Sequence, residues 1–434
     1  MPVGQPASVP PSFGGGKPRK VVISGWYGMG NLGDELILQS IVSQLRSRVG
    51  NVSITILSDR PFQVQNDYGL RSISSARRRL NIARRIMAIS MADIFILGGG
   101  GILMDYGRID TNISRRLEDM EVAQKLRIPN ITWGIGVGEI WTARSMEWMK
   151  RVLPKSDGVF VRDRESAMAL DSLGIRDNVV TTCDAAMMLP PLAEFERTHS
   201  ARGPSRANPK VLVSLRRWYV TGNWTYDEKI FDEVKSSLSK LTSYLSEKRG
   251  AIVTFVPLRT EEGKKDDDRE PESQVQAGAG RDSKTVLIDR VPESRKFMEL
   301  VSDSDLLIGM RLHSLIVASS IGLPCIALSY DDKVSHYMSS VGAGDWSIAM
   351  KDASFETLKR LADDALDGAY PIEKVRNSIR AKRESSNTDV DRAMSLLEKK
   401  ATSLQRTRRY ITGLLMVARR VLARKRKTAQ VAGT

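Results

Sequence analysis

The amino-acid sequence predicts an α/β protein of two Rossmann-like domains that face a central cleft. Three observations support this prediction. The chain has 434 residues, which suits two domains of roughly 200 residues each better than one. Short apolar segments alternate with helical patterns in both halves. Several apolar segments end in glycines or charged residues, which is typical of parallel strands whose carboxyl ends face a ligand.

The first domain is expected over residues 20–185. The segment VVIS at 21–24 is followed by a glycine-rich turn and then by DELILQSIVSQL, whose apolar residues recur at helical spacing. Strand, turn and helix together predict the opening of an α/β unit. Further strands are predicted at 52–57, 93–97, 131–135 and 157–161. The strand at 93–97 runs into glycines 98–101, and the strand at 157–161 runs into Arg162 and Asp163.

A linker and a second α/β series follow. Residues 186–209 contain five Pro or Gly residues between apolar segments, so they are the predicted linker. The second domain is expected over residues 210–400, with its C-terminal part, 354–400, helical. Residues 261–284 are charged, contain glycines and have few apolar side chains, which predicts a mobile loop. Strands are predicted at 210–215, 251–256, 285–289, 305–308 and 325–329.

The composition restricts the class of protein. Residues 1–19 are rich in Pro and Gly and lack a long apolar segment, so we expect a disordered leader and not a signal peptide. No stretch has the roughly 18 consecutive apolar residues that a membrane-spanning helix needs. Cys183 and Cys325 are far apart, which favours neither a disulfide framework nor a zinc site and fits the cytoplasm.

Most of the net charge of +15 lies in the C-terminal tail. Residues 401–434 hold nine Arg or Lys and no Asp or Glu, so they carry +9 and leave +6 for the rest of the chain. Within 404–427, apolar residues at helical spacing predict an amphipathic helix with basic residues around its apolar stripe. Such a helix either lies on an anionic membrane surface or packs on the protein with a solvated basic end. Nucleic acid is not expected as a partner, because Tyr410 is the only aromatic residue among these charges. The predicted stripe consists of Ile411, Leu414, Leu415, Ala418, Val421 and Leu422.

The turn after the first predicted strand reads G-x-G-x-x-G at Gly28, Gly30 and Gly33, and Asp59 ends the next strand where a ribose-binding acid would lie. This pattern is typical of dinucleotide binding. However, Asp34 and Glu35 fall in the first turn of the helix, where carboxylates satisfy the helix dipole and repel a pyrophosphate. The turn therefore binds neutral hydroxyls, or it is a tight strand-to-helix turn without a ligand.

Residues 305–333 place three candidate catalytic side chains after two neighbouring strands. Arg311 and His313 follow the strand at 305–308, and Lys333 follows the strand at 325–329. Because binding sites of open parallel sheets lie at the carboxyl edge, we expect the three side chains to share one site.

The chain resembles the polysaccharide pyruvyl transferase family. The resemblance rests on GWYGMGNLGDE at 25–35, ILGGGGIL at 96–103, WGIGVG at 133–138, VRDRES at 161–166 and the MRLHSL…GLPCIALSYDDKV block at 310–334. It covers residues 20–350 and implies a GT-B-like fold of two Rossmann-like domains. It also implies phosphoenolpyruvate as the donor and a saccharide, free or lipid-linked, as the acceptor in polysaccharide or cell-wall biosynthesis.

The residue types suit this donor, because guanidinium and ammonium groups bind phosphate and carboxylate. Arg311 and Lys333 are the first candidates for phosphoenolpyruvate, and Arg162 and Arg216 are the second. Strand alternation sends only one of Arg216 and Arg217 into the cleft. The candidate acceptor-binding residues are Gly28, Asn31, Asp34, Gly99, Gly100 and Asp163.

His313 is the candidate acid–base residue, since an imidazole gives and takes protons near neutral pH. Of the other two histidines, His199 falls in the predicted linker, and His336 either lines the cleft or has a structural role. No metal site and no cofactor besides the co-substrate is expected. The alternative enzyme classes are a GT-B-type nucleotide-sugar glycosyltransferase and a dehydrogenase, and the non-catalytic alternative is an enzyme-like scaffold held at a membrane by the tail.

Overall fold

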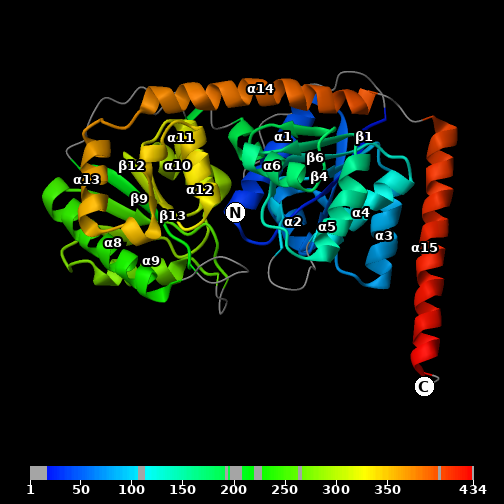
Figure 1. Ribbon diagram of the computed structural model, residues 1–434, viewed down its shortest axis with the longest axis horizontal. Coiled ribbons are helices and arrows are strands. Elements are labelled where there is room, and N and C mark those ends of the chain that lie inside the picture. Colours follow the sequence, from blue (N-terminus) through cyan, green and yellow to red (C-terminus); the bar gives the residue numbers. More distant parts are fainter. Residues whose placement is uncertain are drawn as a thin grey trace.

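The computed structural model describes residues 17–105, 113–190, 194–195, 208–218, 227–261, 266–398 and 402–432. Two α/β domains lie side by side, and a long helix runs across both of them (Figure 1). In both domains the strands pair in parallel, and helices flank the sheet. The predicted fold class is therefore confirmed. The predicted leader lies mostly outside the described residues, and β1 begins at its last residue, Arg19.

The N-terminal sheet has the strand order β3-β2-β1-β4-β6-β7-β8, with β5 paired to β6. The first six of these strands follow the doubly wound order of a Rossmann fold. Its strands are β1 (Arg19–Ser24), β2 (Val52–Ser58), β3 (Arg71–Ser74), β4 (Ile94–Leu97), β5 (Gly100–Leu103), β6 (Asn130–Val137), β7 (Gly158–Val161) and β8 (Val179–Thr181). Its helices are α1 (Leu32–Val49), α2 (Pro61–Tyr68), α3 (Arg79–Ser90), α4 (Ile113–Lys125), α5 (Ala143–Val152) and α6 (Arg164–Ser172).

The C-terminal sheet repeats this order as β11-β10-β9-β12-β13-β14. Its strands are β9 (Lys210–Ser214), β10 (Ile252–Phe255), β11 (Thr285–Leu287), β12 (Leu306–Gly309), β13 (Cys325–Ser329) and β14 (Ser347–Ala349). Its helices are α8 (Glu228–Arg249), α9 (Arg269–Gly278), α10 (Ser294–Ser302), α11 (Leu312–Ile321), α12 (Asp332–Ser340) and α13 (Phe355–Leu366). The order places the ends of β9, β12 and β13 next to one another, so the residues that follow these strands meet at one edge.

The two domains contact each other through the start of α1. The backbone N–H of Leu32 donates to the carbonyl of Leu258 in the C-terminal domain at 2.9 Å, and Gln39 donates to Ser294 at 2.6 Å. Residues 185–188, the end of the first domain and the start of the predicted linker, form a short 3-10 helix (Ala185–Met188) that packs on α1 and α11. This segment is therefore part of the contact between the domains.

Helix α14 (Ile372–Glu398) ties both domains together across their shared side (Figure 1). Arg383 donates to the carbonyl of Met187 at 2.8 Å and to that of Ser320 at 3.3 Å, and so joins the 3-10 helix to α11. Further along α14, Asn387 accepts a hydrogen bond from Arg48 of α1. After α14, helix α15 (Ser403–Ala432) packs on α3.

The ten predicted strands are all present, but four short strands were not predicted. β3, β8 and β14 have three or four residues each, which is too short for a clear alternation pattern. β5 begins inside the glycine run that predicted a turn. The prediction of a mobile loop over 261–284 is wrong, because α9 forms within it around the buried Val275, and the buried acids Asp268 and Glu272 are held by internal contacts.

Candidate functional site

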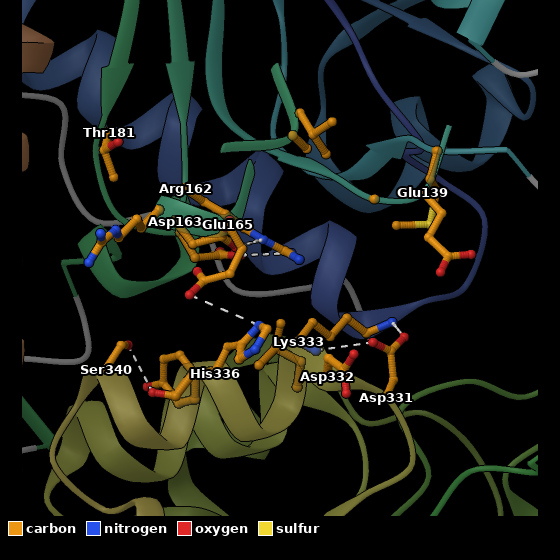
Figure 2. Close-up of a pocket in the computed structure, with 18 of the residues that line it drawn as sticks. Glu139, Arg162, Asp163, Glu165, Thr181, Asp331, Asp332, Lys333, His336 and Ser340 are labelled. Carbon is orange, nitrogen blue, oxygen red and sulfur yellow. Dashed lines mark hydrogen bonds and ion pairs between the residues drawn. The ribbon is translucent and has the colours of Figure 1, made fainter. Parts of the chain in front are cut away.

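A cavity of about 800 Å³ lies between the two domains at the carboxyl ends of β6, β7, β8 and β13. In Figure 2, Arg162, Asp163 and Glu165 of the N-terminal domain face Lys333 and His336 of the C-terminal domain across this space. Glu139 and Trp141, in the loop after β6, also line the cavity. Residues from both domains therefore form one shared site.

Arg162 is one of two arginines, with Arg164, by which the N-terminal domain lines the cavity. It follows β7, and its guanidinium lies over Gly136, where an added Cβ would stand 2.7 Å from Cζ. Arg162 donates to Asp163 at 2.9 Å and lies 3.5 Å from Asp184. Burial alone would lower the pKa of Arg162, but these two carboxylates outweigh burial and raise it. The guanidinium is thus held charged at the cavity wall.

Lys333 and Tyr330 line the opposite wall, after β13. Asp331 caps α12 by accepting from the backbone of Lys333, and it also pairs with the Lys333 ammonium at 2.7 Å. The Tyr330 hydroxyl accepts from Arg216 at 2.8 Å. Burial would raise the pKa of Tyr330, yet Arg216, Lys333 and Arg311 together lower it below its usual value. The potential around this phenol is therefore positive.

Arg311 and Arg216 lie behind this wall, beside buried carboxylates. Arg311 binds the fully buried Asp268 with two nitrogens and reaches Asp266 at 3.2 Å. Asp266 also lies 3.5 Å from Arg216. The neighbouring Arg217 instead pairs with Glu270 at the surface, so of the two arginines it is Arg216 that faces the cleft. Arg311, a first candidate for binding the donor, therefore does not line the cavity with Lys333, because Asp268 and Asp266 hold its guanidinium.

His313 lies at the interface between the domains, in the first turn of α11. Its Nε2 is 3.6 Å from Asp184 Oδ2, an ion-pair distance that is too long for a hydrogen bond. Both atoms are buried, and neither has a hydrogen-bond partner among the residues that the structure describes. Although burial opposes the effect, His313 and Arg162 lower the pKa of Asp184 below its usual range. His313 itself is just behind the wall, between Leu312 and Asp184, which both line the cavity.

Gly33 of the glycine-rich turn packs against this histidine. An added Cβ at Gly33 would lie 2.1 Å from Nδ1 of His313, so only glycine permits this approach. The third glycine of the dinucleotide-like pattern therefore accommodates a side chain of the other domain. Asp59, the candidate ribose-binding acid, instead pairs with Arg115 and accepts a hydrogen bond from Ser75.

The candidate acceptor residues fall into two groups. Asp163 lines the cavity and caps α6 by accepting from Ser166. The others do not line this cavity; they lie in and just after the turn before α1 and in the glycine run after β4. Asn31 caps α1 and contacts Asp34, while an added Cβ at Gly100 would lie 2.9 Å from Asp34. The members of this second group are Gly28, Asn31, Asp34, Gly99 and Gly100.

Glu35, next to this group, has a pKa that folding changes. It is 6% exposed and accepts from the backbone of Gly28 at 2.7 Å, and burial raises its pKa from 4.5 to about 7. In the unfolded chain Glu35 ionises from about pH 4.5, whereas the folded protein keeps it neutral until about pH 7. The folded state therefore loses stability as the pH rises through this window, by about 3 kcal/mol in total.

Replacing Glu35 by Gln should remove this pH dependence, because an amide retains the acceptor oxygen but does not ionise. We expect the free energy of unfolding of Glu35→Gln, relative to the wild type, to rise by about 3 kcal/mol between pH 4.5 and pH 8. Denaturant unfolding at both pH values measures it. The same substitution at the exposed Glu233 is the control and should leave the difference constant. A constant difference for Glu35→Gln as well would contradict the buried, neutral carboxyl.

Several residues of the site were not predicted. Tyr330 and Asp331 were missed although they directly follow the predicted strand at 325–329, a position that signals the sheet edge. Asp184 was missed because it comes shortly after β8, a strand that was not predicted. His336 does line the cavity, 4.0 Å from Glu165 across it (Figure 2). His199 lies outside the described residues. Among those described, no group of three or more His, Cys, Asp or Glu side chains is placed to hold a metal ion.

The two facing Rossmann-like domains and the cavity between them define a GT-B-like protein. Solved structures of this class are similar to the chain in fold. UDP-GlcNAc 2-epimerase of Neisseria meningitidis bound to UDP-GlcNAc has a TM-score of 0.57 and 12% identity, over 88% of this chain and 100% of its own. The Methanocaldococcus jannaschii UDP-GlcNAc 2-epimerase has a TM-score of 0.54 and 12% identity, and the match covers 85% of this chain and 99% of the epimerase. The Staphylococcus aureus MnaA–UDP structure has a TM-score of 0.55 and 11% identity, and the match covers 88% of this chain and 99% of MnaA.

The family is shown by the sequence itself. The family model for polysaccharide pyruvyl transferase matches residues 31–332, which is more than half of the chain. The protein belongs to the polysaccharide pyruvyl transferase family, as the motifs indicated. No curated protein sequence matches it at a significant level. Within the described residues, none of the helices has the length and apolar character needed to cross a membrane.

Proposed function

We propose that this protein transfers a pyruvyl group from phosphoenolpyruvate to two hydroxyls of one saccharide and so forms a cyclic pyruvate ketal in polysaccharide or cell-wall biosynthesis. The observation that carries the proposal is the cavity into which Arg162 and Lys333 project from opposite domains. The lowered pKa of Tyr330 supports it, because Arg216, Lys333 and Arg311 together outweigh burial and Asp331 at this side chain of the cavity wall. Phosphoenolpyruvate carries a phosphate and a carboxylate, which such a wall attracts.

The donor would exchange places with the carboxylates that now hold these cations. Lys333 pairs with Asp331, and Arg162 pairs with Asp163. An incoming phosphate makes stronger charge-assisted hydrogen bonds to the same groups. Arg216 and Arg311 do not contact the donor in this proposal. They contribute positive charge behind the cavity wall, and Arg216 also holds the Tyr330 hydroxyl by a hydrogen bond.

Lys333→Ala should raise the KM for phosphoenolpyruvate about 10- to 100-fold, since a hydrogen bond to a charged group contributes about 1.5–3 kcal/mol. The fold should survive, because Asp331, which is 14% exposed, keeps its hydrogen bond from the backbone N–H of residue 333 in the variant. Steady-state phosphate release measures the effect. Lys351→Ala, at an exposed lysine away from the cavity, is the matched control. An unchanged KM in Lys333→Ala would remove this lysine from the donor site.

The proposed reaction is balanced and requires no cofactor beyond the co-substrate. In this proposal His313, whose ring lies behind the cavity wall beside Asp184, turns into the cavity and delivers a proton to C3 of the enol, which makes C2 electrophilic. One acceptor hydroxyl adds to C2, the C–O bond to phosphate breaks, and the second hydroxyl closes the ring. Of the two hydroxyl protons, one restores the donor acid and the other leaves with phosphate. Asp184 stabilises the charged imidazole, because its carboxylate is ionised and faces Nε2.

The acceptor is proposed to lie in the part of the cavity formed by the N-terminal domain. Asp163, Glu139 and Glu165 supply carboxylates for sugar hydroxyls, and Trp141 supplies an apolar ring edge on the same wall. The fold relatives whose names include UDP-GlcNAc support a sugar substrate in this cleft. The proposed location is the cytoplasm, with the acceptor either free or lipid-linked.

Purified protein incubated with phosphoenolpyruvate and candidate glycans tests the proposal. We expect phosphate release that depends on the glycan, and mass spectrometry should find a product heavier by one pyruvyl ketal. The alternative, a nucleotide-sugar glycosyltransferase, would instead release a nucleotide from UDP-sugars and transfer a hexose. Glycosyl transfer without any pyruvyl product would overturn the proposed function.

A further inference from the structure

Helix α15 uses one face to pack on the N-terminal domain. Gly413 permits the close approach to α3, since an added Cβ would lie 3.0 Å from Ser90, and Met416 and Val417 pack against the same core. Three arginines of this face anchor the helix: Arg406 pairs with Asp93 at 2.8 Å, Arg409 donates to the carbonyl of Arg127 at 2.7 Å, and Arg420 pairs with Glu118 at 3.1 Å. The position of the helix on the domain is thus fixed.

The opposite face of α15 leaves apolar side chains in solvent. Leu404, Ile411 and Leu415 are 78%, 51% and 54% exposed, and their spacing of seven and four residues puts them on one side of a helix, away from Gly413. Leu414, beside them, is 46% exposed. We name Leu404, Ile411, Leu414 and Leu415 the outer stripe.

The exposed apolar side chains of the protein are concentrated around the outer stripe. Of the eleven large apolar side chains that are exposed within the described residues, five lie on α15, so they are concentrated on one helix and not scattered over the surface. The helix also extends past the end of α3 at its C-terminal side (Figure 1). A contiguous apolar stripe on a helix of this length calls for a partner.

The charges around the stripe indicate which partner. Arg408 and Arg419 are exposed beside it, the helix continues into the basic segment 424–427, and residues 401–434 carry +9 without any acidic side chain. A second copy of the helix would bring +9 against +9, which opposes self-association. An anionic lipid surface offers negative charge and an apolar layer together.

We propose that α15 is a docking surface for an anionic bilayer, with the outer stripe inserted among the acyl chains and the arginines at the lipid phosphates. The helix lies along the membrane, and its opposite face holds the N-terminal domain there. This inference does not depend on the reaction that the cleft performs, because none of the residues involved lines the cavity.

Sedimentation of the full-length protein with vesicles tests the inference. We expect binding to phosphatidylcholine vesicles that contain phosphatidylglycerol, and little binding to phosphatidylcholine alone. Ile411→Ser/Leu415→Ser should weaken the partition coefficient at least tenfold, and Arg408→Gln/Arg419→Gln about fivefold for each arginine. The matched control, Phe62→Ser/Val286→Ser, removes two exposed apolar side chains elsewhere and should bind as the wild type does.

A spin label shows whether the stripe itself enters the lipid. Cys183 and Cys325 are both buried, so a label on Ile411→Cys reports one position, with the exposed Phe62→Cys as control. On anionic vesicles the label at 411 should become accessible to oxygen and protected from a water-soluble nickel chelate, and the label at 62 should not change. Equal binding of all variants, a label at 411 that stays in water, or a dimer in sedimentation velocity that the stripe variant abolishes would each overturn the proposal.

Discussion

Replacing His313 by Ala should lower kcat for pyruvyl transfer by about 10²- to 10⁴-fold, the range that positioned acid–base groups contribute. The physical reason is its location. The imidazole is 14% exposed, its Nε2 faces the ionised Asp184, and its neighbours Leu312 and Asp184 line the cavity. No other histidine of the described chain lies in such a position.

The control for this prediction is His336→Ala. His336 also lines the cavity, but it is 49% exposed and lies 4.0 Å from Glu165, so its loss should change kcat by less than tenfold. Circular dichroism of both variants should show the native fold. If His313→Ala retains a near-normal rate, the proposed proton transfer has to be assigned to another group.

Asp184→Asn tests whether the two residues act together. The amide still accepts the hydrogen bond from Ala186 that caps the 3-10 helix, so the backbone should keep its position. We expect a lower kcat than in the wild type, and a double variant with His313→Ala that is no slower than His313→Ala alone, because residues that act as a unit are not additive. Additive losses would mean that Asp184 contributes independently of the histidine.

Replacing Arg311 by Ala should lower the free energy of unfolding by about 3–5 kcal/mol, the cost of removing one partner of a buried ion pair. Asp268 is fully buried, and burial raises its pKa although Arg311 opposes this effect. Asp268 also accepts from the backbone of Leu258 and Arg259, so it holds the loop before α9. Without Arg311, this carboxylate loses its bidentate partner.

Arg217→Ala is the matched control for Arg311→Ala. Arg217 pairs with Glu270 at the surface, with both side chains more than a third exposed, so its removal should cost at most about 1 kcal/mol. Urea unfolding of both variants gives the comparison. A loss of less than 1 kcal/mol in Arg311→Ala would show that the guanidinium is available to the donor instead of supporting the fold.

Part of the site was predictable, because several of its residues directly follow predicted strands. Arg162 follows β7 of the first sheet, and Arg216, Arg311 and Lys333 follow β9, β12 and β13, whose carboxyl ends lie at one edge of the second sheet. Of the four, Arg162 and Lys333 line the cavity. Strand alternation predicted that only one of Arg216 and Arg217 faces the cleft, and the contacts of both side chains show that it is the candidate Arg216. The family motifs lie at these same strand ends, so the family was recognisable from the residues.

Other features were not predictable, because they depend on partners that are far away in the sequence. The glycine-rich turn resembles a dinucleotide site, yet Gly33 makes room for His313, 280 residues away. The charged segment before α9 reads as a mobile loop, yet Asp268 is neutralised by Arg311 of another element. The tail reads as one amphipathic stripe, but Gly413, Met416 and Val417 dock on the domain while Leu404, Ile411 and Leu415 stay exposed.

By itself, the sequence determined the two parallel sheets, the positions of ten of their strands along the chain and the candidate cations after the strand ends, since periodicity and strand-end residues are local properties. Only the tertiary structure decided which carboxylate each cation contacts, that His313 faces Asp184 of the other domain, and which side of α15 is exposed. Those contacts arise where α1, α11 and α14 bring the two domains together, and no local pattern encodes the distance between two separately folded sheets.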